Sequence, residues 1–193
     1  MQFLQLLIVY LFDLDDTIID SSIYSRMYLE LIEKLKAAVG EEKVDSMAES
    51  LKKGEKRPDT YELSKALGQT ELYYKVLEQA IARTYSLKSP VITKIFKSLN
   101  VRKKKIGIVS NSQARTINLF LEKFLLLQYV DFVESGRKET VFFWHEVERK
   151  HSLYKPNTLV IDDNADVLAL VSRAGYNVMS SKDMPKLLEE VAN

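Results

Sequence analysis

The sequence predicts an α/β protein with a doubly wound parallel sheet and a helical block inserted near its start. From Ser89 to the C-terminus, short apolar runs alternate with helical patterns, as in parallel α/β sheets. A further apolar run, residues 3–12, stands before a stretch with helical periodicity and no strand pattern, residues 22–88. With 193 residues the chain has room for one sizeable core and a small second domain. We therefore predict an α/β core from residues 1–20 and 89–193, and an inserted helical domain from residues 21–88.

The opening apolar run is expected to be a strand buried on both faces. No basic segment precedes it, no small-residue cleavage site ends it, and Asp13 follows it directly, so it does not read as a signal peptide. Its ten residues are about half of what a membrane span needs. The chain also contains no cysteine, so the sequence predicts a cytoplasmic protein with no membrane partner.

Two apolar stripes at helical spacing organise the inserted block. The first runs from Ile23 to Leu35 and is expected to stop at Gly40. The second runs from Leu72 to Ile81, with Thr70 as the expected N-cap. A turn-like segment, residues 54–60, lies between them, and the block is predicted to form a small helical bundle.

The second half alternates between helices and strands. Ser89 is the expected N-cap and Pro90 the first residue of a helix that ends near Asn100. The expected strands are residues 105–109, 129–133, 158–161 and 176–179, and the expected helices are residues 114–124, 139–150 and 165–174 with a terminal helix.

Composition and missing motifs exclude several functions. Lys and Arg number 28 against 27 Asp and Glu, so the net charge of +1 argues against nucleic acid as a partner. The lack of cysteine excludes disulfides, thiolate metal sites and cysteine nucleophiles. Neither GxGxxG nor GxxxxGK[ST] occurs, and His145 and His151 lack the spacing of a zinc site.

Acidic and hydroxyl side chains follow three of the expected strands. They are Asp13, Asp15 and Asp16 after the first strand, Ser110, Asn111 and Ser112 after another, and Asp162, Asp163 and Asp166 after a third. In a doubly wound sheet these strand ends meet and form the ligand crevice. Carboxylates brought together there repel one another unless a cation neutralises them, and a hard cation that prefers oxygen ligands, such as Mg²⁺, is expected. Lys138 lies in the same half of the chain.

These segments resemble the four motifs of the haloacid dehalogenase-like (HAD) superfamily, in the family order. The matching stretches are Asp13-Leu-Asp15-Asp16-Thr17 for DxDx(T/V), Ile108-Val-Ser110-Asn111, Lys138, and Ile161-Asp162-Asp163-Asn164-Ala165-Asp166. The resemblance covers the whole chain, and the helical block lies where subclass I members carry their cap. It implies a Rossmann-like core with a helical cap, similar to phosphoglycolate phosphatases.

The resemblance implies a Mg²⁺-dependent phosphatase that works through an aspartyl-phosphate. Asp13 would be the nucleophile and Asp15 the general acid and base. Ser110, the backbone at Asn111 and Lys138 would bind the phosphoryl group. Mg²⁺ would be held by Asp13, the carbonyl of Asp15 and Asp162, with Asp163 and Asp166 as additional or indirect ligands. The expected partner is a small phosphorylated metabolite.

Several alternatives stay open at this stage. Lys138 is followed by Glu-Thr and not by the proline-containing stretch of many relatives, so Arg137, Lys150 or Lys155 could replace it. A 2-haloacid dehalogenase is a second reading, although dehalogenation needs neither a leaving-group proton nor a metal. A non-catalytic phosphate-binding or phospho-acceptor module is a third. The sequence does not choose between monomer and homodimer, and it does not name the phosphate ester.

Overall fold

The computed structural model describes residues 7–52, 54, 57–84 and 86–192. The chain divides into two compact units. We call Met1–Asp20 with Ser86–Asn193 the α/β unit, and Ser21–Tyr85 the helical unit. No helix in the described part of the chain is both long enough and apolar enough to cross a membrane.

A five-stranded sheet forms the centre of the α/β unit. Its strands are β1 (Val9–Phe12), β2 (Lys105–Ser110), β3 (Phe132–Ser135), β4 (Thr158–Asp162) and β5 (Asn177–Ser180). They lie in the order β3-β2-β1-β4-β5, and every neighbouring pair is parallel. The predicted parallel α/β fold is therefore confirmed.

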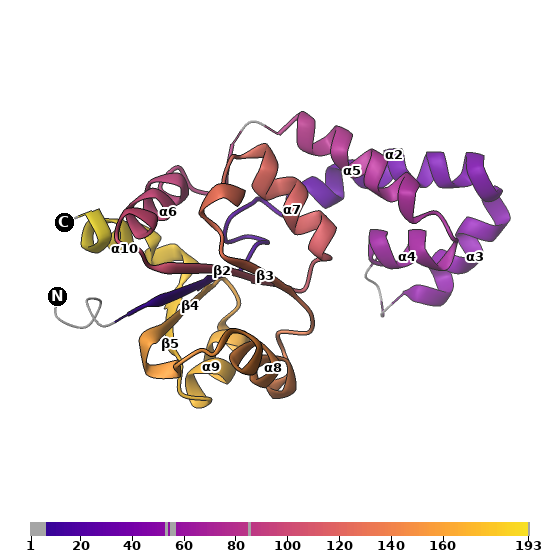
Figure 1. Cartoon of the computed structure of the whole chain (residues 1–193). Coiled ribbons are helices and arrows are strands. Elements are labelled where there is room, and N and C mark those ends of the chain that lie inside the picture. The colour runs from indigo at the N-terminus through magenta and orange to yellow at the C-terminus, as the bar shows by residue number, and fades with distance from the viewer. Residues whose placement is uncertain (1–6, 53, 55–56, 85, 193) are drawn as a thin grey trace. The chain divides into compact units, whose positions relative to one another are not determined.

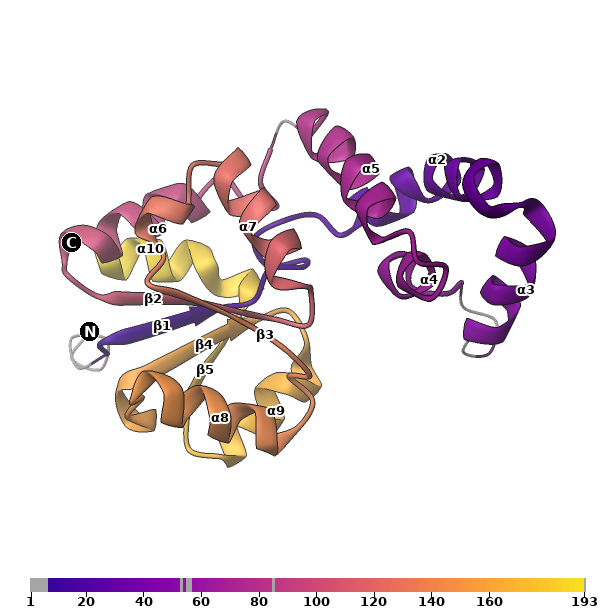
Figure 2. The same cartoon turned by 45° about the vertical axis from the view of Figure 1, so that its right-hand side comes forward.

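Helices cover both faces of this sheet. They are α6 (Ile92–Val101), α7 (Ala114–Lys123), α8 (Val141–His151), α9 (Ala165–Arg173) and α10 (Met184–Ala192). Figures 1 and 2 show α6, α7 and α10 on one face and α8 and α9 on the other, which makes the sheet doubly wound.

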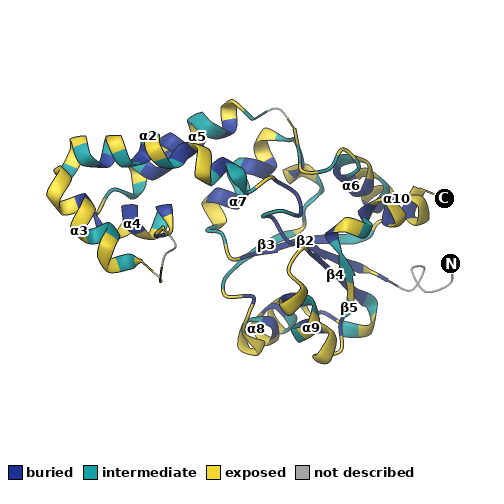
Figure 3. Cartoon of the chain, turned by 180° about the vertical axis from the view of Figure 1, so that it is seen from behind, coloured by how far each residue is buried: buried dark blue, intermediate teal, exposed yellow. Residues whose placement is uncertain are grey.

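The central strands are buried on both faces, as Figure 3 shows by their dark blue colour. Every residue of β1 and of β4 is buried. This explains why both strands are continuous apolar runs and do not alternate with polar residues. Under α8 and α9 the core is built around Trp144, with Tyr176, Val147 and Val171 beside it.

Several strand and helix boundaries differ from the sequence prediction, most by one or two residues. The described part of the first strand starts at Val9, and residues 3–6 of the predicted run lie outside the described residues. β3 starts at Phe132 and not at residue 129, because a 3-10 turn (Leu127–Tyr129) comes first and Asp131 is tied to Ile106 of β2 through both its backbone and its carboxylate. α6 begins at Ile92, since Ser89 and Pro90 form a turn in which the Ser89 hydroxyl accepts the backbone N–H of Val91.

The helical unit contains four described helices, α2 (Ser22–Val39), α3 (Glu41–Leu51), α4 (Thr60–Ala66) and α5 (Thr70–Ala82). The first apolar stripe becomes the buried face of α2, with Ile23, Met27, Leu31 and Leu35 at every fourth position. Gly40 ends this helix as predicted. Its φ of 94° suits glycine, and its N–H donates to the carbonyl of Lys36.

Two features of this unit were not predicted. The sequence pattern did not separate α3 and α4, which are short and whose buried faces are narrow. α4 begins where the carboxylate of Asp59 accepts the N–H of Glu62 at 2.9 Å, a side-chain N-cap. Thr70 is the first residue of α5 and not its N-cap, which is Gln69.

An ion-pair cluster joins α8 to the edge strand β3. The carboxylate of Glu134 lies 2.7 Å from Lys150 Nζ and 2.6 Å from His151 Nε2, and the His151 ring stacks on Phe132. Burial raises the pKa of Glu134, but the hydrogen bonds from Lys150 and His151 outweigh burial and hold the pKa below its ordinary value.

We expect Glu134→Gln to lower the free energy of unfolding by about 1 kcal/mol at pH 7. A carboxylate with a lowered folded pKa stabilises the protein above the pKa of the unfolded state, and this stabilisation is lost as the pH falls through the folded pKa. The difference between wild type and variant should therefore shrink towards pH 3, as measured by urea unfolding at the two pH values. Glu146→Gln, which breaks an exposed pair with Arg149, serves as the control. An equal loss at both pH values would contradict this role of the charge.

Candidate active site

The carboxyl ends of four neighbouring strands meet at one edge of the sheet. Asp13 follows β1 directly, Ser110 ends β2 and Asp162 ends β4. Ser135, the last residue of β3, pairs with Ser110, and Lys138 follows it within the next turn. In an open α/β sheet this edge is where ligands bind.

The loop after β1 folds back on itself and fixes Asp13 and Asp15. The N–H groups of Ile18 and Ile19 both donate to the carbonyl of Leu14, at 2.8 and 3.0 Å. Asp16 takes a φ of 57°, and its carboxylate is held by Lys88 Nζ at 2.9 Å. Thr17, within this turn, is fully buried.

Lys138 lies between two buried carboxylates. Its Nζ donates to Asp13 Oδ1 and, at 2.7 Å, to Asp162 Oδ2. The three residues are 5%, 4% and 1% exposed, respectively. Burying charges is costly unless they are paired, so this ammonium holds two carboxylates that would otherwise repel each other.

The pKa values of this cluster follow from burial and from the charges in contact. Burial raises the pKa of Asp13 to about 7, the Lys138 charge opposes that shift, and Asp162 adds to it. Burial lowers the pKa of Lys138, but the attraction of Asp13 and Asp162 is larger, so the net pKa is raised and the ammonium stays charged. A second cation beside Asp13 would lower the pKa of its carboxyl group.

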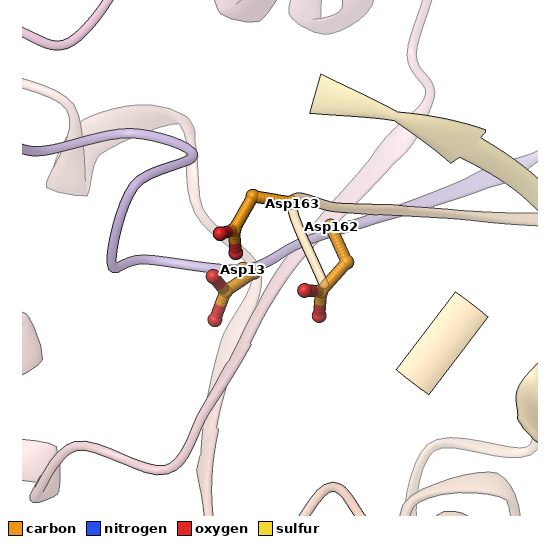
Figure 4. Close-up of side chains that lie close together, drawn as sticks. All are labelled: Asp13, Asp162 and Asp163. Carbon is orange, nitrogen blue, oxygen red and sulfur yellow. The ribbon is translucent and has the colours of Figure 1, made fainter. Parts of the chain in front are cut away.

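Asp163 joins these residues and completes a group of three carboxylates. One oxygen each from Asp13, Asp162 and Asp163 lie within 4.8 Å of one another, at the ends of β1 and β4 (Figure 4). Burial, then Asp162 and Asp16, raise the pKa of the more exposed Asp163. Among the described residues Asp166 lies outside this group; it is exposed in the first turn of α9.

Asp15 is held by a serine that the sequence analysis did not single out for a role. The Ser112 hydroxyl donates to Asp15 Oδ2 at 2.7 Å, and the Ser112 N–H donates to the hydroxyl of buried Ser110 at 3.0 Å. The Ser135 hydroxyl donates to the carbonyl of Ser112, which ties this loop to β3. Only the position of Ser112, two residues after Ser110, signalled it in the sequence.

The side chain of Asn111 connects two loops. Its Oδ1 accepts the N–H of Lys138 at 2.9 Å, and its Nδ2 donates to Glu139 at 2.5 Å. The alternatives to Lys138 lie elsewhere. Arg137 is exposed, Lys150 pairs with Glu134, and Lys155 pairs with Glu148 at 3.0 Å.

Comparisons with known proteins agree with this architecture. CbbY from Rhodobacter sphaeroides in complex with phosphate superposes with a TM-score of 0.62 at 13% identity, covering 90% of this chain and 85% of CbbY. A predicted HAD-like hydrolase from Porphyromonas gingivalis gives 0.60 at 19% identity, with 91% of each chain covered. L-2-haloacid dehalogenase from Xanthobacter autotrophicus, with chloropropionic acid covalently bound, gives 0.58 at 17% identity, with 89% and 76% covered. At these identities the likeness concerns the fold.

The family assignment comes from the sequence over most of its length. No curated protein sequence matches the chain. The model of the haloacid dehalogenase-like hydrolases matches residues 10–179, a range that includes Asp13, Ser110, Lys138 and Asp162. The chain therefore belongs to the haloacid dehalogenase-like hydrolase family.

Proposed function

We propose that the protein is a Mg²⁺-dependent phosphatase that hydrolyses a small phosphate monoester through an aspartyl-phosphate. One observation carries the proposal. A lysine ammonium bridges two buried carboxylates, Asp13 and Asp162, and a third carboxylate, Asp163, lies within metal-binding reach of both. Such a site has a nucleophile, a fixed positive charge and a set of oxygen ligands at one point.

Asp13 is the proposed nucleophile. Its carboxylate oxygen would form a bond to phosphorus while the bond from phosphorus to the ester oxygen breaks, giving an aspartyl-phosphate and an alcohol. The charge of Lys138 would reduce the repulsion between the carboxylate and the phosphate and stabilise the transferring group. The hydroxyl of Ser110 and the backbone at Asn111 would donate hydrogen bonds to the phosphoryl oxygens.

Asp15 is the proposed general acid and base. It would first give a proton to the leaving ester oxygen and then remove one from the water that attacks the aspartyl-phosphate. That water restores the Asp13 carboxylate and releases inorganic phosphate. The hydrogen bond from Ser112 fixes one oxygen of Asp15, which supports a role that requires a defined direction.

The residues present fit a magnesium ion. Carboxylate oxygens are its preferred protein ligands, and Asp13, Asp162 and Asp163 offer three of them within 4.8 Å. We propose that these residues and the carbonyl of Asp15 hold it. When bound, the ion supplies positive charge that offsets the charge of the phosphate.

The proposed cap comprises residues 21–88, a range that contains the helical unit, Ser21–Tyr85. A small phosphorylated metabolite is the proposed substrate and the cytoplasm the proposed location. The fold shared with CbbY supports this class of substrate, since that protein was solved with phosphate and, as a mutant, with xylulose-(1,5)bisphosphate. No specific ester follows from this likeness.

Dehalogenation is the competing reaction within the family, because the same fold occurs in the Xanthobacter enzyme. Displacement of a halide by a carboxylate needs no proton for the leaving group and no metal. That reaction would use the Asp13 carboxylate as nucleophile. A positioned Asp15 and the additional carboxylates of Asp162 and Asp163 would have no function in it, so these three residues favour phosphate ester hydrolysis.

Hydrolysis of p-nitrophenyl phosphate tests the proposal. We expect turnover with Mg²⁺, loss of turnover with EDTA, and recovery when Mg²⁺ is added in excess. The same samples incubated with 2-chloropropionate should release no chloride. Chloride release that persists in EDTA would favour the dehalogenase, and phosphate binding without turnover of any phosphate ester would favour a non-catalytic module.

A further inference from the structure

Both main-chain groups of Lys138 are held by side chains from other elements. The N–H donates to Asn111 Oδ1, in the loop after β2. The carbonyl accepts a hydrogen bond from the indole Nε1 of Trp144, in α8, at 2.7 Å. Lys138 itself lies in the turn between β3 and α8, outside any helix or strand, so no regular ladder fixes its backbone.

Trp144 is anchored well enough to act as a fixed donor. It is 2% exposed and belongs to the core cluster under α8 and α9, where its ring contacts those of Phe143 and Tyr176. The turn also runs close to α8, because a Cβ at Gly136 would lie 2.6 Å from the ring of Phe143. A buried, close-packed indole cannot follow a moving loop, so its N–H defines where the Lys138 carbonyl must point.

We propose that Trp144 is a positioning residue for Lys138. A lysine side chain has four rotatable bonds and loses much conformational entropy when its amine is held at one point. With Asn111 and Trp144 fixing the peptide groups before and after its Cα, the side chain leaves the turn in one direction. Few side-chain rotamers of Lys138 then remain, and in the one observed Nζ donates to both Asp13 and Asp162.

The catalytic part of this inference rests on the proposed function, in which Lys138 binds the phosphoryl group. The structural part, that Trp144 holds Lys138 in place, does not depend on the proposed function. Loss of the indole N–H should loosen Lys138 whether or not the protein hydrolyses phosphate esters, and this gives a test that needs no activity.

The first experiment measures how fast Lys138 reacts with acetic anhydride, by quantitative peptide mass spectrometry, with exposed Lys97 as the internal reference. Lys138 is 5% exposed and should react slowly in the wild type. In Trp144→Phe the phenyl ring fills most of the space of the indole, but the N–H donor is lost. We expect Lys138 to react about five-fold faster than in the wild type, which corresponds to the free energy of one ordinary hydrogen bond. Val147→Ala, another core change on α8, should leave the relative rate unchanged.

An isosteric change separates the hydrogen bond from the volume of the ring. Trp144 is the single tryptophan of the chain, so growth on benzothienylalanine, which has sulfur in place of the indole N–H, alters this position alone. We expect the same faster labelling of Lys138 as in Trp144→Phe. An unchanged Lys138 rate in both proteins would overturn the proposal.

A double-mutant cycle on p-nitrophenyl phosphate hydrolysis tests the catalytic part. Trp144→Phe should lower kcat/KM about five-fold in the wild-type background and have no effect in a Lys138→Met background. Equal losses in both backgrounds would show a merely structural tryptophan. If the wild type has no activity while Lys138 labelling responds to Trp144, the proposed function fails and the positioning role stands.

Discussion

Asp13→Asn should lower kcat for p-nitrophenyl phosphate by about 10⁴-fold or more, the scale seen when a nucleophile is removed from a covalent mechanism. The amide has nearly the shape of the carboxylate but cannot form an acyl-phosphate of the same kind. It also removes one of the three carboxylates that lie within metal-binding reach. We therefore expect both turnover and the affinity for Mg²⁺ to fall.

Steady-state kinetics and the thermal response to Mg²⁺ measure these two losses separately. Asp183→Asn, at a partly exposed aspartate in the 3-10 turn before α10, is the control and should behave as the wild type. Asp13→Asn should remain folded, because the Lys138 ammonium keeps its hydrogen bond to Asp162. Turnover that persists in Asp13→Asn would contradict the assignment of Asp13 as the nucleophile.

We expect the second large effect from Lys138→Met, which should lower both the stability of the protein and its turnover. Removing one partner of a buried charge cluster typically costs about 3–5 kcal/mol, because the remaining charges are left unpaired. Here Asp13 and Asp162 would face each other without the ammonium that bridges them. The loss of a fixed charge at the phosphoryl group should lower kcat about 10²- to 10³-fold.

The stability loss of Lys138→Met should depend on pH with a defined sign. Burial already raises the pKa of Asp13 to about 7, and loss of the opposing lysine charge raises that pKa further. A carboxyl group with a raised folded pKa binds a proton that the unfolded chain releases, so stability falls as the pH rises towards the folded pKa. Wild type and variant should therefore differ more at pH 8 than at pH 5.

Urea unfolding in EDTA at the two pH values measures this difference, with exposed Lys97→Met as the control. Addition of Mg²⁺ should raise the stability of Lys138→Met more than that of the wild type, since the ion replaces the missing charge. A stability loss that is independent of both pH and Mg²⁺ would mean that the lysine stem matters only for packing.

The fold could be predicted because its signals are local. The apolar runs that became β1, β2 and β4 are buried on both faces, and Gly40 stops α2 by its own backbone preference. Prediction was poorer where contacts with an adjacent strand set the boundary of an element. The start of β3 depends on the ties between Asp131 and Ile106, and these follow from strand order and not from the residues around position 129.

The same distinction applies to the site. Asp13, Ser110 and Asp162 could be placed at one edge, because each comes where a parallel strand ends. The hydrogen bond from Ser112 to Asp15 joins residues 97 positions apart, and the bond from Trp144 to Lys138 depends on how α8 packs. Neither contact follows from hydrophobic periodicity or from turn propensity.

The strand order has a consequence for synthesis on the ribosome. β1 is made first, yet its neighbours are β2 and β4, and Phe12 pairs with Ile108 and Ile161. The helical unit is one continuous stretch, Ser21–Tyr85, and is complete before any partner strand of β1 has been made, so β1 remains unpaired until β2 and then β4 have been translated. The nascent chain therefore exposes an aggregation-prone strand for most of its translation, and chaperone binding at this stage would raise the yield of folded protein.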